Sequence, residues 1–222
     1  QAAREDGKHD KTDDSFPGEI LRLVQRYKTG ARGGSSATGK VKMTNHWTLP
    51  EMYMRAIKKT MGRVTERFAS PLNVSRLTSQ YFSAFREDAV FGAEHNAYSR
   101  AFTGPSEANP EYETHELHKC LKWAIQSTYN GDPACTLLVY PDWIGEKYQE
   151  LMDHPRVHVL HRIKQPHFAF DTPEKFTGLQ DNKAHNAHWD VMFILVANLE
   201  GLAEFTDATD AVAAETAFAE AN

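Results

Sequence analysis

The chain has 222 residues, 41% of them hydrophobic, with 25 Lys and Arg against 30 Asp and Glu, a formal net charge of −5. This composition can build one α/β core with tails, and it excludes wholesale disorder, collagen-like chains and repeat chains. Residues 1–15 carry a net charge of −2 and residues 200–222 one of −6, so residues 16–199 carry +3 and remain compatible with a nucleic-acid partner.

The first third of the chain is predicted to hold two helices. A polar tail covers residues 1–15, and residues 17–27 then show apolar positions at the spacing of a helix face. A Gly- and Ser-rich loop is expected over residues 29–40. The pattern Thr48-Leu-Pro-Glu51 predicts a second helix start, with Thr48 as N-cap and Glu51 completing a capping box.

From residue 64 onward the pattern is that of an α/β fold. The segments 135–140 and 191–197 are continuously apolar, as in strands that are buried on both faces. Strands separated by helix-length segments predict a sheet that helices cover on both faces. Residues 202–222 are expected to form a loose helix or a disordered acidic tail. The predicted strands are 64–69, 135–140, 157–161 and 191–197, with a helix at 113–127.

The cysteines, the apolar runs and the first residues of the chain bear on its cellular compartment. Two cysteines, Cys120 and Cys135, make no disulfide framework, so a reducing environment is expected. The longest apolar run, at 191–197, is too short to cross a bilayer, and we expect no membrane partner. The chain opens at Gln1 without a signal-like apolar segment or an initiator methionine, as a processed or trimmed product would.

Two segments partly match known binding motifs. The loop Gly34–Lys40 resembles a phosphate-binding P-loop but has no preceding strand and no Ser or Thr after its Lys, so a surface loop is expected. His115, His118 and Cys120 lie close in sequence, which raises a metal-dependent hydrolase as a third hypothesis. The spacing His-Glu-Leu-His is one residue short of the metalloprotease motif, and we expect no metal.

The segment Asn109-Pro-Glu-Tyr112 has the most chemical content. The exocyclic amino group of adenine is a poor nucleophile because its lone pair is delocalised into the ring. An Asn side-chain oxygen and a Pro carbonyl can accept its N–H bonds and orient the lone pair toward a methyl donor, while an aromatic ring stacks on the base. Asn109, Pro110 and Tyr112 are therefore candidate catalytic residues, although Asn-Pro alone is more often an ordinary turn.

Several other segments accompany this motif in a fixed order. The whole series resembles the methyltransferase domain of the phosphorylated CTD-interacting factor family, from about residue 20 to residue 198. The resemblance implies a Rossmann-like class I methyltransferase domain over residues 16–201, with S-adenosylmethionine as the methyl donor and N6 of cap-adjacent adenosine in RNA as its target. The segments are Phe68-Ala-Ser-Pro-Leu-Asn73, Tyr81–Phe85, Phe91-Gly92, Glu107–Pro110, Tyr140–Trp143 and 188–198.

The resemblance also implies roles for single residues. Ser70, Pro71 and Asn73 follow the first core strand and would line the methyl-donor pocket, at the strand end where doubly wound sheets hold ligands. Asp88 is a candidate for binding the donor's ribose or amine. The target amino group would lie against Asn109 and Pro110, with Tyr112 stacked on the base.

RNA contacts are expected from basic residues and from one aromatic residue. The basic residues would bind phosphates, although a solvated helix face is the commoner explanation for such a cluster. Trp143 would stack on a nucleotide at the rim of the site or, equally, pack beneath a loop. The candidates are Lys58, Lys59, Arg63, Arg67 and Trp143.

Two departures from the family pattern keep a second interpretation open. Glu111 stands where the family has a second proline, which frees a backbone dihedral and places an anion beside the base. The family's large helical region and its phosphopeptide-binding WW module are also expected to be missing. The alternative is a catalytically degenerate subunit with a structural or RNA-binding role in a ribonucleoprotein such as a mitochondrial ribosome. The compartment is nuclear or cytoplasmic for an active cap-type enzyme and mitochondrial for the subunit.

Overall fold

The computed structural model describes residues 16–30, 47–143, 146–171 and 185–206. The chain divides into two compact units, residues 1–44 and residues 45–222. Helix α1 (Phe16–Gly30) is the described part of the first unit, and it contains the predicted helix 17–27. Glu19 in its first turn pairs with Arg22 one turn later, and a carboxylate there is favourable toward the helix dipole.

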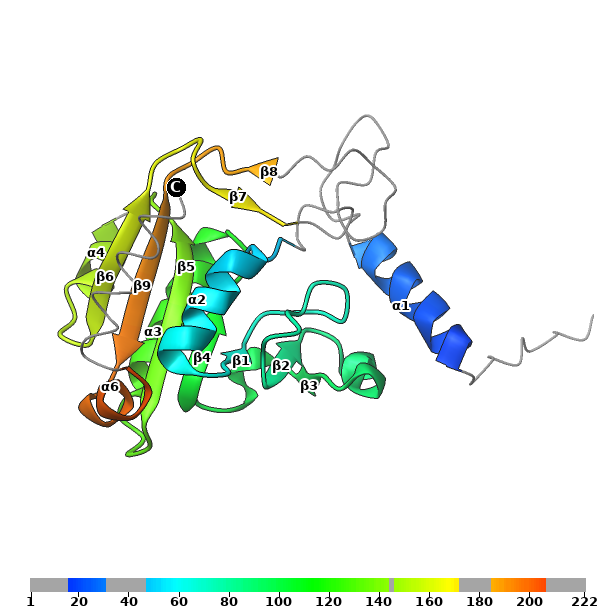
Figure 1. Cartoon of the computed structure of the whole chain (residues 1–222), viewed down its shortest axis with the longest axis horizontal. Helices are drawn as coiled ribbons and strands as arrows, with labels where there is room; N and C mark the ends of the chain where they lie inside the picture. Colours follow the sequence, from blue (N-terminus) through cyan, green and yellow to red (C-terminus); the bar gives the residue numbers. More distant parts are fainter. Residues whose placement is uncertain (1–15, 31–46, 144–145, 172–184, 207–222) are drawn as a thin grey trace, which may run out of the picture. The chain divides into compact units, whose positions relative to one another are not determined.

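The second unit is built on a seven-stranded sheet with the strand order β3-β2-β1-β4-β5-β9-β6 (Figure 1). The first five strands pair in parallel, whereas β9 is antiparallel to both of its neighbours, β5 and β6. This mixed, mostly parallel sheet confirms the predicted Rossmann-like α/β fold. The strands are β1 (Thr65–Glu66), β2 (Gln80–Ser83), β3 (Glu94–His95), β4 (Gly104–Ala108), β5 (Ala134–Pro141), β6 (Val157–Ile163) and β9 (Val191–Ala197).

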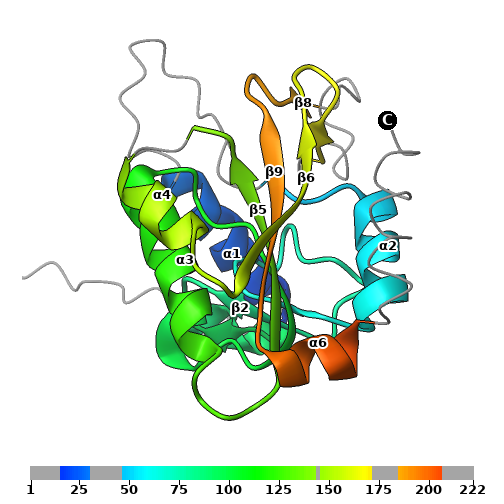
Figure 2. The ribbon, with the colours of Figure 1, turned by 90° about the vertical axis from the view of Figure 1, so that its left-hand side faces the viewer.

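Helices cover both faces of this sheet. Figure 2 shows α3 and α4 on one side of β5, β9 and β6, with α2 on the other side. A separate two-stranded antiparallel ribbon is formed by β7 (Ala169–Phe170) and β8 (His185–Asn186). Within the described residues, no helix has the length and apolar character that spanning a membrane requires. The helices are α2 (Glu51–Met61), α3 (Thr114–Ser127), α4 (Glu146–Met152) and α6 (Leu199–Phe205).

The two faces of the sheet have separate apolar cores. Strands β5 and β9 are buried along their whole length, which confirms the expectation drawn from their continuous apolar runs. Each large apolar side chain that is fully buried in these cores stabilises the fold by about 1.5–3 kcal/mol through the hydrophobic effect. On the α2 side the core contains Tyr53, Met54, Ile57, Leu137, Val139 and Phe193. On the α3 side it contains Leu117, Leu121, Leu138, Tyr140, Met192 and Ile194.

Several element boundaries differ from the predicted ones. Strand β1 has two residues in place of the predicted six, because the chain leaves the ladder after Glu66, although the Ala69 N–H still bonds the Phe82 carbonyl at 2.9 Å. Helix α2 begins after Pro50, its N-cap residue, which has no side-chain acceptor. The predicted N-cap residue, Thr48, lies two residues earlier and forms a backbone bridge with Asp171. The P-loop-like segment 34–40 and the tail 207–222 lie outside the described residues.

Candidate functional site

The sheet has a topological switch point between β1 and β4. From β1 the strand order runs to β2 and β3 on one side, and to β4 and β5 on the other. In open α/β sheets, ligands bind outside the carboxyl ends of the strands at such a point. The predicted donor turn, residues 70–73, follows β1, the donor candidate Asp88 follows β2, and the predicted target residues follow β4. These three strands are neighbours in the sheet, so the segments that carry the predicted residues leave the sheet from adjacent strands.

The predicted donor turn, Ser70 to Asn73, is closed by its own side chains. The Asn73 Oδ1 accepts hydrogen bonds from the Ser70 backbone N–H and from the Ser70 hydroxyl, both at 2.7 Å. Both side chains are buried, while Pro71 is half-buried. Short polar side chains that bond locally to the backbone are typical of tight turns. Within the described residues the Asn73 Nδ2 donates to no acceptor, so it is the polar group that this turn can offer to a ligand.

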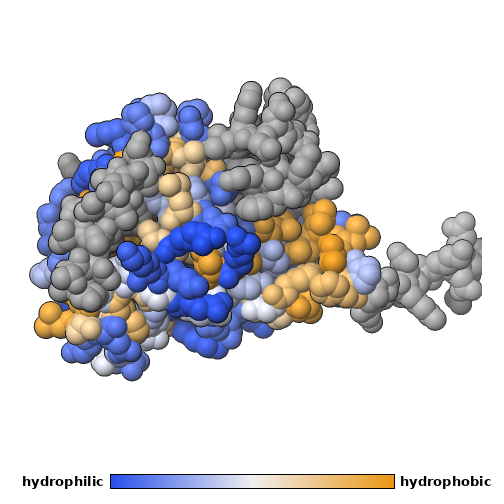
Figure 3. Space-filling model, viewed as in Figure 1, coloured by the Kyte–Doolittle hydropathy of each residue, from blue (hydrophilic) through white to orange (hydrophobic). Residues whose placement is uncertain are grey.

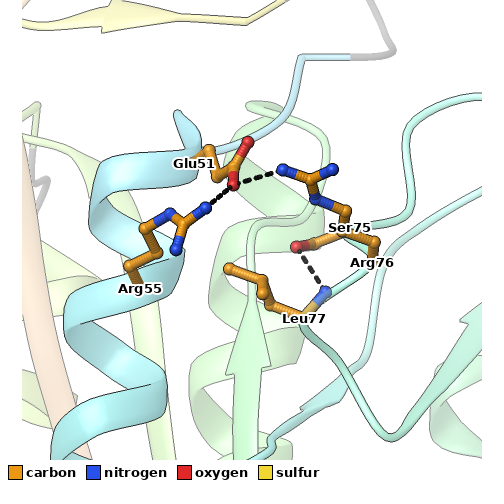
Figure 4. A network of polar contacts seen from close by, with 5 residues as sticks. All are labelled: Glu51, Arg55, Ser75, Arg76 and Leu77. Carbon is orange, nitrogen blue, oxygen red and sulfur yellow. Dashed lines mark hydrogen bonds and ion pairs between the residues drawn. The ribbon is translucent and has the colours of Figure 1, made fainter.

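The segment after this turn is anchored at two points. Figure 4 shows Glu51 of α2 between two arginines: its Oε1 accepts from Arg55 at 2.6 Å and from Arg76 at 2.7 Å. The bond from Arg76, followed by that from Arg55, lowers the pKa of the Glu51 carboxyl. On the inner side, the backbone N–H of Ser75 donates to Glu66 Oε2 at 3.0 Å. The loop is therefore tied both to α2 and to the end of β1.

Asp88 lies beneath the surface beside β2. Its side chain is fully buried, and the hydroxyl of Ser83, the last residue of β2, donates to its Oδ2 at 2.5 Å. The 3₁₀ turn Arg86–Phe91 carries it, and the turn ends at Gly92 with φ 86°, a conformation that favours glycine. The structure thus places Asp88 near the carboxyl end of β2, where its Oδ2 already accepts the hydrogen bond from the Ser83 hydroxyl.

Asn109 and Pro110 directly follow β4. The Asn109 side-chain N–H donates to the carbonyl of Trp47 at 3.3 Å, while its oxygen accepts nothing from the described residues. Pro110 is buried and Glu111 is exposed. Because the amide nitrogen of Asn109 is held, its oxygen is the end left to accept a hydrogen bond from a ligand. This is the orientation that the predicted adenine chemistry requires.

Five aromatic residues form one cluster beside Asn109, which we call the aromatic cluster: Trp47, Tyr112, Trp143, Phe170 and Trp189. Tyr112 meets three of the others edge to face, with ring centroids 5.7–6.2 Å apart, and its hydroxyl donates to the Val139 carbonyl at 3.2 Å. Trp47 stacks on Phe170 at 5.2 Å and on Trp189 at 5.5 Å. Burial raises the pKa of Tyr112 well above its usual range, so this residue stays a neutral phenol.

Two members of the aromatic cluster show what it can offer to a ligand. Trp143 is 44% exposed, at the surface of the cluster, and also packs edge to face on Trp189 at 5.2 Å. The Trp189 indole N–H is buried and has no acceptor among the described residues. Tyr112 and Trp143 were predicted from the sequence, whereas Trp47, Phe170 and Trp189 were not. They come from distant segments, so no spacing in the sequence connects them.

Sequence analysis also missed a pair of buried carboxyl groups at the switch point. Glu66 on β1 and Glu107 on β4 are register partners in adjacent parallel strands, and they are 4% and 2% exposed. Burial raises the pKa of Glu66 to about 7, and burial together with Glu66 raises the pKa of Glu107 well above its usual range. Little in the sequence pointed to this pair, because each Glu lies in a short strand that also contains other polar residues.

The predicted RNA-binding basic residues fall into two groups. Lys58 and Lys59 are exposed on α2, where Figure 3 shows a hydrophilic area, and Arg63 is exposed with its guanidinium bonded to the Thr78 carbonyl. The assignment of Arg67 as a surface phosphate ligand is corrected: it is 4% exposed. Its guanidinium donates to the hydroxyl of Ser106, at 2.9 and 3.0 Å from two nitrogens. Arg67 is part of the α3-side interior.

The histidines and cysteines do not assemble into a donor set in the described parts of the chain. No three or more His, Cys, Asp or Glu side chains there are arranged to hold a metal ion. His115 lies 3.5 Å from the carboxylate of Glu113 on the surface of α3, whereas Cys120 is buried in the core. The two cysteines are free, and burial raises the pKa of each thiol to about 12.

Comparison with known proteins identifies one family. A family profile described as the phosphorylated CTD interacting factor 1 WW domain matches residues 3–163, well over half of the chain. We expected a WW module to be missing; the profile is named for such a module, and the described residues of the matched stretch fold as helices α1 to α4 and strands β1 to β6. No curated protein matches the chain.

Proposed function

Because the chain belongs to the phosphorylated CTD interacting factor 1 family, we propose that it is an S-adenosylmethionine-dependent methyltransferase acting on N6 of adenosine in RNA. The observation that carries the proposal is the state of Asn109 at the carboxyl end of β4. One end of its amide is bonded to Trp47, and the other end accepts nothing from the described residues. An oriented acceptor of this kind is what the weakly nucleophilic amino group of adenine needs.

The surroundings of Asn109 support this role. Tyr112 and the exposed Trp143 provide aromatic surface three and 34 positions further along the chain, and base stacking on such rings is worth about 1–3 kcal/mol per base. The Ser70–Asn73 turn lies across the switch point, where the methyl donor would bind. Transfer from a sulfonium needs alignment and exclusion of water more than an acid or a base, so no catalytic triad is required.

Methyl transfer to defined RNAs tests the proposal. Capped RNAs that begin with adenosine or with guanosine are incubated with radiolabelled S-adenosylmethionine, and label is expected only in the adenosine RNA. Asn109→Ala is expected to abolish transfer while leaving the affinity for S-adenosylhomocysteine unchanged, because Asn109 binds the target and not the donor. Absence of transfer to either RNA, together with absence of S-adenosylhomocysteine binding, would refute the activity.

The second candidate function is a degenerate methyltransferase-like subunit that binds RNA within a ribonucleoprotein. Glu111 favours it, because an exposed carboxylate stands where the family has proline, between Pro110 and Tyr112, and would repel the phosphates of a bound RNA. The variant Glu111→Pro separates the two functions. Restored transfer in this variant but not in the natural chain would support degeneration. Equal transfer by both would support an active enzyme that tolerates the anion.

A further inference from the structure

The buried carboxyl pair, Glu66 and Glu107, has no part in the chemistry described so far. Register partners in adjacent parallel strands project their side chains from the same face of the sheet, and Leu137 of β5 is the next partner of Glu107. Leu137 belongs to the α2-side core, so both carboxyl groups lie on that face. Asn109, two positions beyond Glu107, bonds Trp47 just before α2, which places it on the same side.

The pair is incompletely satisfied. The Ser75 N–H donates to Glu66 Oε2, whereas Glu107 Oε1 is buried and has no hydrogen-bond partner among the described residues. Such an orphan oxygen in a native protein calls for a bonding partner, because leaving it bare costs about 1–3 kcal/mol. Glu66 is bonded to the segment after the Ser70–Asn73 turn, and Glu107 lies two residues before Asn109, so the pair joins the two strands that lead to the predicted donor and target residues.

No described cation compensates the pair. The titratable groups that interact with Glu107 are Glu66, Tyr112 and Cys120, and none of them is a base. Helix α2 packs buried apolar side chains on this face, while its Lys58 and Lys59 are exposed. Glu107 is the more deeply buried of the two and its Oε1 lacks a described donor, so once Glu66 has ionised above pH 7, Glu107 retains its proton.

We propose that the Glu66–Glu107 pair is a subsite for a cationic amino group, with Glu107 Oε1 as its direct acceptor. The ligand identity rests on the proposed function: the group is the α-ammonium of the amino-acid part of the methyl donor. When the ammonium binds, the carboxyl proton of Glu107 leaves to solvent, and the pair becomes fully ionised against the bound cation. Binding of the donor is therefore coupled to the release of about one proton.

Calorimetric titration in buffers of different ionisation enthalpy measures this proton directly. The probes are S-adenosylhomocysteine, which carries the ammonium, and 5′-methylthioadenosine, which lacks it. At pH 8, where Glu66 is already ionised, S-adenosylhomocysteine is expected to release about one proton, and its affinity to rise by about tenfold per pH unit near that pH. Methylthioadenosine is expected to release none.

Matched variants assign the proton to the pair. Glu107→Gln keeps the shape but cannot ionise, so S-adenosylhomocysteine should bind at least tenfold more weakly and without proton release, while methylthioadenosine is unaffected. Glu150→Gln, on the exposed surface of α4, is the control and should behave as the natural chain. Proton-neutral binding of S-adenosylhomocysteine, or unchanged release in Glu107→Gln, overturns the subsite while the proposed function stands. Absence of binding by both ligands overturns the proposed function and the subsite with it.

Discussion

Replacing Glu66 by Gln is expected to remove a pH dependence from the stability of the folded chain. The pKa of Glu66 rises from an ordinary value of 4.5 to about 7 in the fold, chiefly because the side chain is buried. A raised carboxyl pKa means that the native state holds a proton that the unfolded chain has lost. The stabilisation is therefore complete below pH 4.5 and is lost progressively as the pH rises to about 7.

The size of the effect follows from the pKa difference. Since one pKa unit corresponds to about 1.4 kcal/mol, Glu66 accounts for a loss of about 3 kcal/mol between pH 4.5 and pH 7. A Gln side chain keeps an acceptor for the Ser75 N–H and brings a donor for Glu107. The variant should match the natural chain near pH 4.5 and exceed its stability by up to about 3 kcal/mol at pH 8.

Urea unfolding at pH 5, 6, 7 and 8, followed by tryptophan fluorescence, measures the difference between the two chains. Glu150→Gln provides the control, because Glu150 is exposed and its charge should matter little. The reasoning would be refuted by a stability difference between Glu66→Gln and the natural chain that stays constant from pH 5 to pH 8. That result would mean that Glu66 is ionised in the fold.

Four further outcomes are expected. Gly201→Ala should lower the free energy of unfolding by about 3 kcal/mol or more, because an added Cβ would stand 2.1 Å from the Ala134 carbonyl oxygen; Glu204→Ala on the same helix is the control in urea unfolding. Tyr112→Phe should cost about 1 kcal/mol through the bond to Val139, and Tyr112→Ala about 3–5 kcal/mol through loss of the ring, so equal costs for both would show that the ring packs loosely. Replacing Lys58 and Lys59 by Ala should reduce the slope of log affinity for RNA against log salt by about 2, and an unchanged slope would remove both from the interface. Arg67→Met should leave that slope unchanged and lower the free energy of unfolding by about 2 kcal/mol or more, because it deletes buried bonds to Ser106 and Thr103.

The elements that could be predicted from sequence are those whose apolar pattern determines their environment. The runs at 135–140 and 191–197 identified two buried strands, and residues 113–127 identified α3. The antiparallel direction of β9 could not be predicted, because a strand that is buried on both faces shows the same apolar run in either direction. Similarly, the length of β1 was overestimated because Phe68 and Ala69 are apolar although the chain has already left the ladder.

The part of the candidate site that lies in one contiguous sequence motif could be predicted. Asn109, Pro110 and Tyr112 are close in sequence, and their spacing carries the chemistry. The rest depends on tertiary structure: Trp47, Phe170 and Trp189 join the aromatic cluster only because distant segments converge. Arg67 was misassigned because a basic residue next to Lys58, Lys59 and Arg63 in sequence gives no sign that its guanidinium turns inward.

The position of β9 has a consequence for the order in which the chain folds. Among the described strands, β6 pairs with β9 alone, and β9 is also the second partner of β5, so residues 191–197 join the middle of the sheet to its edge. During synthesis, the backbone groups of β5 and β6 that pair with β9 remain without these partners until residues 191–197 have been made. A fragment limited to the family match, residues 3–163, would contain β5 and β6 but not β9, which pairs with both. Expression of that fragment is expected to yield aggregation in place of a smaller folded domain.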